Sequence, residues 1–400
     1  MFQNLKSVLV FGVGPLQKSI IRRAKLMGLY TVGIDPAENA TCRNEADAFE
    51  VVGGQDYEGT CEIVERYGVD AIVTAATDKP LVMMARVAQK YNFPFYSVDT
   101  AKWSTDKFQM KQRFMEGGVP CAKGRLVKSV EEVDDFEYPV IVKPRDNSGS
   151  RGVKLCHSKE ELQMSMTEAL GVSRFDSVLV EEFIEGPEYS IESLHYDGKS
   201  EIIQFTEKKT TDFPYNVELG HRQPATLSAL QKAKIQDIVV KIAACLQYEN
   251  CPSHTELKIN KRGIFVIETS PRLGGDYITS TLTPLSTGVN LEDQLLCIAL
   301  GCPPDTKVCH PKAASGVCFF SLPQGEIIEI DRSIDEVKTW PNICDFEFKL
   351  HVGDMVSPIT SSLNRYGHFI VMATDRNRLD ELLDDYAERI SIMIKIVGPK

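Results

Sequence analysis

The sequence lacks long hydrophobic runs. No window approaches 18 apolar residues, so no membrane-spanning helix is expected. The apolar run in MFQNLKSVLVFGVG is short and ends in a Gly-x-Gly turn instead of a small-residue cleavage site, which excludes a signal peptide. We therefore predict a cytoplasmic protein with no membrane partner.

Paired cysteines and basic runs are also lacking. The 11 cysteines form no Cys-x-x-Cys pair, and the closest group, Cys297, Cys302 and Cys309 with His310, is too spread out for paired zinc ligands. Reduced, mostly buried thiols are therefore favoured. The formal net charge is -11 and no basic run compensates it, which argues against a nucleic-acid partner.

What the sequence does have is the length and composition of a multidomain globular protein. Its 400 residues are 43% hydrophobic and 25% charged, and this length corresponds to about two to four domains. In the first hundred residues, short apolar runs alternate with amphipathic segments, a pattern that predicts a parallel α/β sheet. The expected strands are 7–13, 30–35, 47–52 and 70–76, and the expected helices are 15–28, 60–68 and 80–92.

The rest of the chain has a different pattern. Residues 101–118 predict one charged linker helix, closed by paired glycines and followed by Pro120. Short β-rich runs around a helix at 158–171 then indicate a small α+β module over 119–185. Strands dominate from 186 to 400, with helices expected at 228–247 and 290–301. We thus predict four parts: 1–100, 101–118, 119–185 and 186–400.

The turn FGVGPLQ carries Gly12 and Gly14 after the first strand, and Asp35 ends the second strand. A dinucleotide fingerprint needs a third glycine at position 17, where Gln17 stands. A tight strand-to-helix turn is therefore favoured over an NAD site, which remains the alternative.

A candidate phosphate site follows an apolar strand in VIVKPRDNSGSRGV (140–153). Lys143 ends the strand, and the small, polar loop with Ser148, Gly149 and Ser150 can offer backbone N–H donors to a phosphate. The lysine precedes the glycines, so this is not a Walker A loop. A surface loop with a solvated lysine would have the same pattern.

A candidate adenine site lies in SVLVEEFIEGPEYSIE (177–192). A buried strand runs into Glu181 and Glu182, and then into Phe183 and Ile184, which can sandwich a ring. Glu188 is placed to hold ribose hydroxyls. An edge strand with exposed acids is the alternative interpretation.

A predicted β-hairpin carries the candidate metal site. The runs HTELKI (254–259) and IFVIETSPRLGG (264–275) place Glu256 and Glu268 on opposite arms of the hairpin. Buried carboxylates are costly unless they are paired or metal-bound, and Mg²⁺ prefers carboxylates together with substrate phosphates. Arg272, beside Gly274 and Gly275, could stabilise charge on a transferred phosphoryl group. Ion pairs of the two glutamates with Lys258 and Arg272 are the alternative.

These three features occur in an order that resembles the ATP-grasp superfamily, over nearly the whole chain. The resemblance implies an ATP-grasp fold of α/β and α+β parts, with residues 1–100 as a Rossmann-like, parallel-sheet pre-ATP-grasp domain. It implies ATP and two Mg²⁺ (or Mn²⁺) ions as cofactors. It adds Lys107, in the entry helix TDKFQMKQRFMEGGVP, as a further phosphate ligand. Many members place Asn where Ser270 stands, so Ser270 is expected to be a weaker metal ligand, directly or through water.

The polar segment EKKTTDFPYNVELGHRQPA (207–225) is predicted to be a loop. It is either a substrate lid, with Glu218 and His221 facing the cleft, or a plain surface loop. Members similar to this sequence carry a Gly-His-x-x-Pro element here, which favours the lid. The substrate candidates are thus Glu218, His221, Arg272, Gly274 and Gly275.

The resemblance is to the L-amino acid (dipeptide) ligases, and also to the biotin carboxylase and carbamoyl phosphate synthetase group. It implies a carboxylate–amine ligase acting through an acyl phosphate on small-molecule substrates, with Lys143 and Arg272 as catalytic residues and a homodimer as a possible assembly. The alternatives are a bicarbonate-activating enzyme, a non-catalytic ATP-binding protein of the same fold, and an NAD-dependent oxidoreductase. The sequence shows no biotinyl Met-Lys-Met motif and has the length of one ATP-grasp unit.

Overall fold

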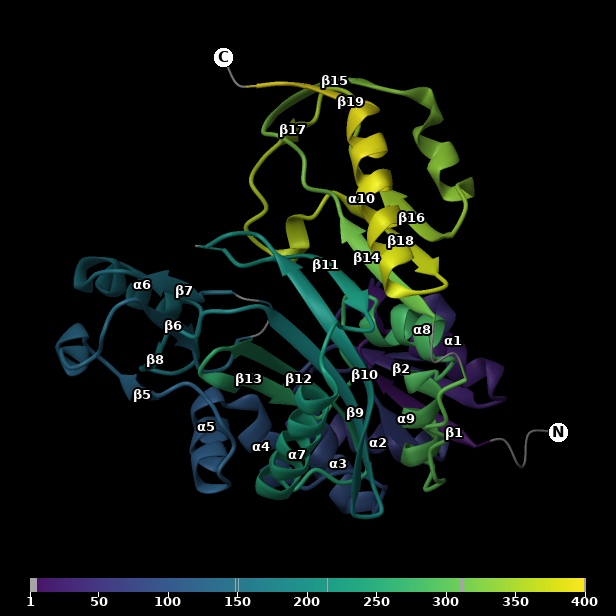
Figure 1. Ribbon diagram of the computed structural model, residues 1–400. Coiled ribbons are helices and arrows are strands. Elements are labelled where there is room, and N and C mark those ends of the chain that lie inside the picture. The colour runs from purple at the N-terminus through teal and green to yellow at the C-terminus, as the bar shows by residue number, and fades with distance from the viewer. Residues whose placement is uncertain (1–5, 148, 150, 214, 310–312, 399–400) are drawn as a thin grey trace.

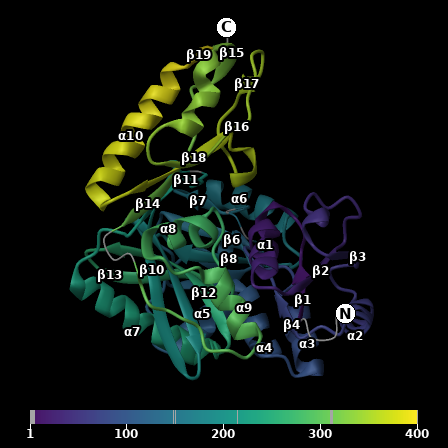
Figure 2. The ribbon, with the colours of Figure 1, turned by 90° about the vertical axis from the view of Figure 1, so that its right-hand side faces the viewer.

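The computed structural model describes residues 6–147, 149, 151–213, 215–309 and 313–398. Three parts surround the long strands β9 (Glu188–Tyr196) and β10 (Lys199–Thr210), as Figure 1 shows. A small sheet lies at the left, the yellow C-terminal part at the top and the purple N-terminal part at the lower right. In Figure 2 the N-terminal part lies below the C-terminal part, at the side of the molecule.

The N-terminal part is a parallel sheet of strand order β3-β2-β1-β4, flanked by helices, which confirms the α/β prediction. The carboxyl ends of its strands, where ligands bind in such sheets, face the rest of the chain through the loops after β1 and β4. The elements are β1 (Ser7–Phe11), η1 (Pro15–Gln17), α1 (Lys18–Leu26), β2 (Tyr30–Asp35), η2 (Arg43–Glu45), β3 (Ala48–Val51), α2 (Tyr57–Tyr67), β4 (Ala71–Val73) and α3 (Leu81–Tyr91).

The Gly-rich turn after β1 is held by hydrogen bonds to other residues of the N-terminal part. Gly12 adopts a φ of +85°, which glycine tolerates best. The Gln17 side chain accepts from the Gly14 amide at 3.2 Å and donates to the Ala75 carbonyl at 2.6 Å. The carboxylate of Asp35 accepts from the Val13 amide at 3.0 Å. These contacts favour the structural turn over the NAD site.

The predicted linker helix over 101–118 is wrong in one respect, because two helices stand there. They are α4 (Val98–Thr105) and α5 (Lys107–Glu116). Asp106 between them has an extended backbone, and its carboxylate accepts from the Phe108 and Gln109 amides. An N-cap aspartate of this kind starts a new helix, so Lys107 becomes the first residue of α5.

The small sheet is antiparallel, with the order β5-β8-β6-β7 and α6 packed against it. Its core contains Val140, Val142, Leu162 and Val180. The elements are β5 (Gly124–Val127), η3 (Val130–Val133), β6 (Val140–Pro144), β7 (Lys154–Cys156), α6 (Lys159–Gly171) and β8 (Val178–Glu182).

The large sheet is antiparallel and runs β13-β12-β9-β10-β11-β14-β18-β16. A three-stranded sheet, β17-β15-β19, lies at the top of the C-terminal part in Figure 1. Helix α10 packs on β14 and β18. The remaining strands are β11 (Glu218–Gln223), β12 (Cys251–Asn260), β13 (Gly263–Ser270), β14 (Ala314–Phe319), β15 (Gly325–Ile330), β16 (Ile343–Phe348), β17 (Met355–Val356), β18 (Gly367–Ala373) and β19 (Ile394–Val397). The helices are α7 (Ala229–Leu246), the π-helix η4 (Ile278–Leu282), α8 (Thr283–Thr287), α9 (Leu291–Ala299), η5 (Arg332–Thr339), η6 (Ser362–Asn364) and α10 (Arg376–Ile392).

The predicted loop over 207–225 is also wrong, because most of it is strand. β10 continues to Thr210, and β11 pairs with it in antiparallel register from Glu218 to Arg222. The polar composition suggested a loop, but Lys208 of β10 and Glu218 of β11 line a charged cavity.

One apolar core joins the N-terminal sheet to the large sheet, with Leu9 and Ile72 in the same cluster as Ile191 and Leu257. The predicted boundaries at 100, 118 and 185 stay a prediction. Within the part of the chain that the structure describes, no helix combines the length and the apolar character needed to span a membrane.

Candidate active site

A cavity between the small sheet and the large sheet brings most of the predicted nucleotide and metal residues together. It is also lined by Lys208, which the sequence analysis missed, and by Lys258, which was named there only as a possible ion-pair partner. Ser148 and Ser150, predicted for the phosphate loop, lie outside the described residues. The predicted residues that line this cavity are Lys107, Lys143, Gly149, Glu181, Glu182, Phe183, Ile184, Glu188, Glu218, Glu256 and Glu268.

Lys143, the predicted phosphate ligand, is held at the end of β6 by a buried carboxylate. Its ammonium lies 2.6 Å from one oxygen of Glu181, and Lys111 lies 2.6 Å from the other. Burial alone would raise the pKa of Glu181, but the two lysines lower it below its usual value. Glu181 therefore orients Lys143. Both of its carboxylate oxygens are paired with lysines, so neither is free to contact a nucleotide base.

An apolar slot follows β8. Phe183 contacts Phe213 edge to face, with ring centroids 5.3 Å apart, and the Lys258 ammonium lies 5.3 Å from the Phe183 ring. Ile184 is buried, and Ile141 and Ile267 line the same cavity. Glu182 also lines the cavity, and its carboxylate is paired with Arg262 at 2.9 Å. The slot can take a planar ring between aliphatic and aromatic groups.

The hairpin β12–β13 places Glu256 directly opposite Glu268 in its register. Glu256 is paired with Lys208 at 2.7 Å, and Glu268 with Lys107. The two glutamates are therefore ion-paired, as the alternative interpretation expected, but their partners are Lys208 and Lys107 and not Lys258 and Arg272. Burial would raise the pKa of Glu256, but Lys208 and His254 keep this pKa well below its usual value. The Glu256 carboxylate is therefore ionised.

Lys208 is a centre of charge that the sequence analysis did not find. Its buried ammonium lies 2.5 Å from Glu188, 2.7 Å from Glu256 and 3.4 Å from Glu218. The signal was its place in the strand run 199–211, but 207–225 was also interpreted as a lid or a surface loop, and no role was assigned to Lys208.

The carboxylates of this cavity suit a hard divalent cation that also takes oxygens from a nucleotide. No group of three or more His, Cys, Asp or Glu side chains among the described residues could hold a metal alone. Two facing glutamates that need phosphate oxygens to complete the shell are what Mg²⁺ sites commonly use. Glu256 and Glu268 thus fit the metal implied by the sequence.

Ser270 and Arg272 turn toward Asp78, in the loop after β4. The Ser270 hydroxyl donates to Asp78 at 2.5 Å, and the Arg272 guanidinium lies 3.1 Å from the same carboxylate. Burial would raise the pKa of Asp78, but Arg272 lowers it. The signal for Asp78 was its place after the carboxyl end of a parallel strand.

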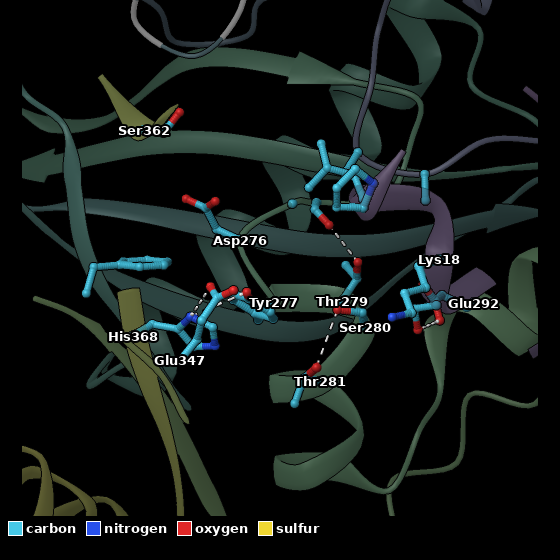
Figure 3. A pocket seen from close by; sticks show the side chains of 18 of the residues that line it. Lys18, Asp276, Tyr277, Thr279, Ser280, Thr281, Glu292, Glu347, Ser362 and His368 are labelled. Atoms are coloured by element: carbon cyan, nitrogen blue, oxygen red, sulfur yellow. Dashed lines mark hydrogen bonds and ion pairs between the residues drawn. The ribbon is translucent and has the colours of Figure 1, made fainter. Parts of the chain in front are cut away.

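A second cavity of about 460 Å³ lies between α1, the turn after β13 and the C-terminal part (Figure 3). Gly274 and Gly275 line it, as do Lys18 and Glu292 on one side and Glu347 and His368 on the other.

Asp276 and Tyr277 form the C-terminal side of this cavity and were not predicted. Both have positive φ angles, 50° and 66°. Asp276 binds Arg365 through both carboxylate oxygens, at 2.8 and 2.6 Å, and this pairing lowers its pKa although burial opposes it. The Tyr277 and His368 rings lie 4.4 Å apart. Since Arg365 and His368 are about 90 residues away in the sequence, no local pattern indicates this contact.

Glu218 and His221 do not face one cleft together. Glu218 lines the first cavity, whereas His221 is buried beside Asp276, with its Nε2 3.6 Å from that carboxylate. His221 pairs with Lys208 and Glu218 with Thr210, on either side of an irregularity in the register, so the two side chains lie at different points along β11.

Comparison with known proteins defines the class. A family model described as an ATP-grasp domain matches residues 136–280, and one described as L-amino acid ligase C-terminal domain 2 matches residues 318–395. Residues 136–280 therefore match the ATP-grasp family. Within it, the enzyme class is that of the ADP-forming ligases.

Individual relatives are distant. An uncharacterized protein of Sinorhizobium fredii is 24% identical over 326 residues, which cover 80% of this chain and 67% of that protein. The carbamoyl phosphate synthase large chain of Bifidobacterium adolescentis is 26% identical over 332 residues, 74% of this chain, but the match spans only 29% of that protein. The crystal structure of L-amino acid ligase from Bacillus licheniformis superimposes with a TM-score of 0.81 at 20% identity, covering both chains fully.

Proposed function

We propose that the chain is an ATP- and Mg²⁺-dependent carboxylate–amine ligase. The observation that carries the proposal is that one segment lines both cavities: Glu268 faces the first, and Gly274 to Tyr277 line the second. Arg272 lies between Glu268 and Gly274 in the sequence, and it is not among the described residues that line either cavity. A nucleotide in the first cavity and small substrates in the second would therefore meet at this segment.

In the first cavity, Lys107 and Lys143 hold the phosphates, and Phe183 and Ile184 enclose the base. Glu256 and Glu268, with Ser270 nearby, hold the divalent cation. The cation, when bound, neutralises phosphate charge. Glu188 is placed for the ribose, and Lys208 keeps it oriented.

In the first step, a substrate carboxylate oxygen attacks the γ-phosphorus of ATP, the bond to ADP breaks, and an acyl phosphate forms. In the second step, a neutral amine attacks the acyl carbon, the C–O bond to phosphate breaks, and the amine nitrogen loses a proton. Arg272, oriented by Asp78, holds the carboxylate and stabilises the negative charge of both transition states. Positioning and charge neutralisation supply most of the catalysis in such transfers.

The name of the superimposed ligase and the matching C-terminal domain support an amino acid as one substrate. Bicarbonate is the second candidate for the activated carboxylate, because a carbamoyl phosphate synthase large chain is among the relatives.

The test is phosphate release from ATP and Mg²⁺ with pooled amino acids and other small carboxylates, with and without bicarbonate, followed by mass spectrometry. We expect release that needs both a carboxylate and an amine, and a product lighter by one water than their sum. Nucleotide binding without release from any pool would contradict the proposal and favour the non-catalytic alternative.

A further inference from the structure

A buried histidine lies between the two cavities. His254 on β12 stands opposite Glu192 on β9 and Ser270 on β13 in the sheet register. Its Nδ1 lies 2.5 Å from a Glu192 oxygen, and the side chains of both residues are almost fully buried. A polar pair in such a place is costly unless each of its members is fully bonded.

The other ring nitrogen of His254 lies near Glu256, which lines the first cavity. Nε2 lies 3.5 Å from the same Glu256 oxygen that binds Lys208. Glu256 is one of the two glutamates proposed to hold the divalent cation. Its carboxylate is thus positioned by a lysine on β10 and by a histidine two residues before it on its own strand.

The other oxygen of Glu192 contacts Gly274, which lines the second cavity. It accepts from the amide of Gly274 at 3.3 Å, while the Gly274 carbonyl accepts from the Thr279 hydroxyl at 2.6 Å. A Cβ on Gly274 would lie 2.7 Å from His254 Nδ1 and 2.9 Å from Glu192. Only glycine at position 274 leaves room for the His254 and Glu192 side chains. These side chains are in direct contact with the wall of the second cavity at Gly274.

We propose that His254 is a positioning residue that, with Glu192, fixes the metal-binding carboxylate of Glu256 to the wall of the second cavity. The contacts run without a break from Gly274 through Glu192 and His254 to Glu256. The inference rests on the proposed function in one respect, that Glu256 binds the cation. Outer contacts of this kind change metal affinity by about 10–100-fold when removed.

The neighbouring glycine provides a matched control. Gly275 lines the same cavity, but a Cβ there would meet only the Ala76 side chain, at 3.5 Å, which is an ordinary contact. A second control is His195, a buried histidine of β9 whose ring nitrogens bind two serine hydroxyls at 2.9 and 2.8 Å. His195 lines neither cavity among the described residues.

The experiment measures Mn²⁺ binding in the presence of ADP, by the electron paramagnetic resonance of free Mn²⁺, with no carboxylate or amine added. We expect Gly274→Ala and His254→Gln each to weaken Mn²⁺ binding about tenfold, as removal of an outer contact does. Gly275→Ala and His195→Gln should bind Mn²⁺ as the wild type does, although His195→Gln lowers the unfolding temperature.

Wild-type Mn²⁺ affinity in folded Gly274→Ala and His254→Gln would overturn the inference, as would an equal loss in His195→Gln. Glu256→Gln separates this failure from that of the metal assignment. If Glu256→Gln weakens Mn²⁺ binding and the other two variants do not, only the inference fails. If Glu256→Gln also binds Mn²⁺ normally, the metal site proposed here fails with it.

Discussion

At the scale of residues, the first cavity is a set of matched charges. Lys107 pairs with Glu268, Lys208 with Glu256 and Lys143 with Glu181, each within a largely buried environment. Ion pairs that lose water are stable only when both partners remain. The pairs keep the lysines ordered in positions where an anionic nucleotide can bind them.

Lys143→Ala tests the phosphate site. We expect ATP affinity to fall about tenfold or more, because a hydrogen bond to a charged group contributes about 1.5–3 kcal/mol. Isothermal titration with a non-hydrolysable ATP analogue measures it. Lys154→Ala on β7 is the control, since Lys154 pairs with Glu168 outside the cavity. Equal affinity in Lys143→Ala and the wild type would count against the phosphate assignment.

Glu268→Gln tests the metal site. The amide keeps the shape and can still accept from Lys107, so the folded state should survive. We expect turnover to fall by about 100-fold or more, since a metal ion supplies several kcal/mol of charge stabilisation in such reactions. Turnover and the denaturation midpoint are measured together. Near wild-type turnover in the variant would remove Glu268 from the metal site.

Glu292→Gln tests a buried carboxyl group beside the second cavity. Burial raises the pKa of Glu292 from 4.5 to about 7, while the Ser19 hydroxyl, bonded at 2.5 Å, and Arg23 oppose the shift. Between these two pH values the folded state binds more protons than the unfolded state, so wild-type stability falls as pH rises from about 4.5 to 7.

Glutamine cannot ionise, so this loss should be absent in the variant. From pH 4.5 to pH 8, the unfolding free energy of Glu292→Gln should rise relative to the wild type by up to about 3 kcal/mol. Urea unfolding at both pH values measures the difference. A pH-independent difference between the two proteins would show that Glu292 ionises normally in the folded state.

At the scale of elements, the junction of α4 and α5 sets the position of Lys107. Asp106 caps α5 and also binds Arg145, which follows β6 after Pro144. One side chain therefore ties the start of a helix to the strand that carries Lys143.

Asp106→Ala should destabilise the fold by about 3 kcal/mol, since it removes both a cap and the partner of a largely buried arginine. Asp56→Ala, which removes the exposed cap of α2, should cost only about 1 kcal/mol. Chemical denaturation of both variants measures the two costs. Equal costs would show that the Arg145 contact contributes nothing.

The same elements show what the sequence could predict. Apolar strands with a polar end, such as β6 with Lys143, and the hairpin with Glu256 and Glu268 follow from local periodicity. The break at Asp106 and the polar strand β11 did not, because a capping residue inside a charged run and a polar cavity wall both look like ordinary surface.

At the scale of the whole molecule, contacts between distant segments complete the site. Asp78 meets Ser270 from 192 positions away, and Arg365 meets Asp276 from 89 positions away. Glu192 and His254 meet because β9 and β12 are neighbouring strands in the large sheet. Such pairs depend on how the three parts pack together, which a single sequence does not specify.

The central claim is that a substrate carboxylate is activated by ATP at the segment shared by the two cavities. The most direct test is to supply the carboxylate substrate found by screening with ¹⁸O in its carboxyl group, and to analyse the phosphate released by mass spectrometry. An acyl-phosphate route transfers one ¹⁸O atom to phosphate for each product formed. Product formation with unlabelled phosphate would contradict the account.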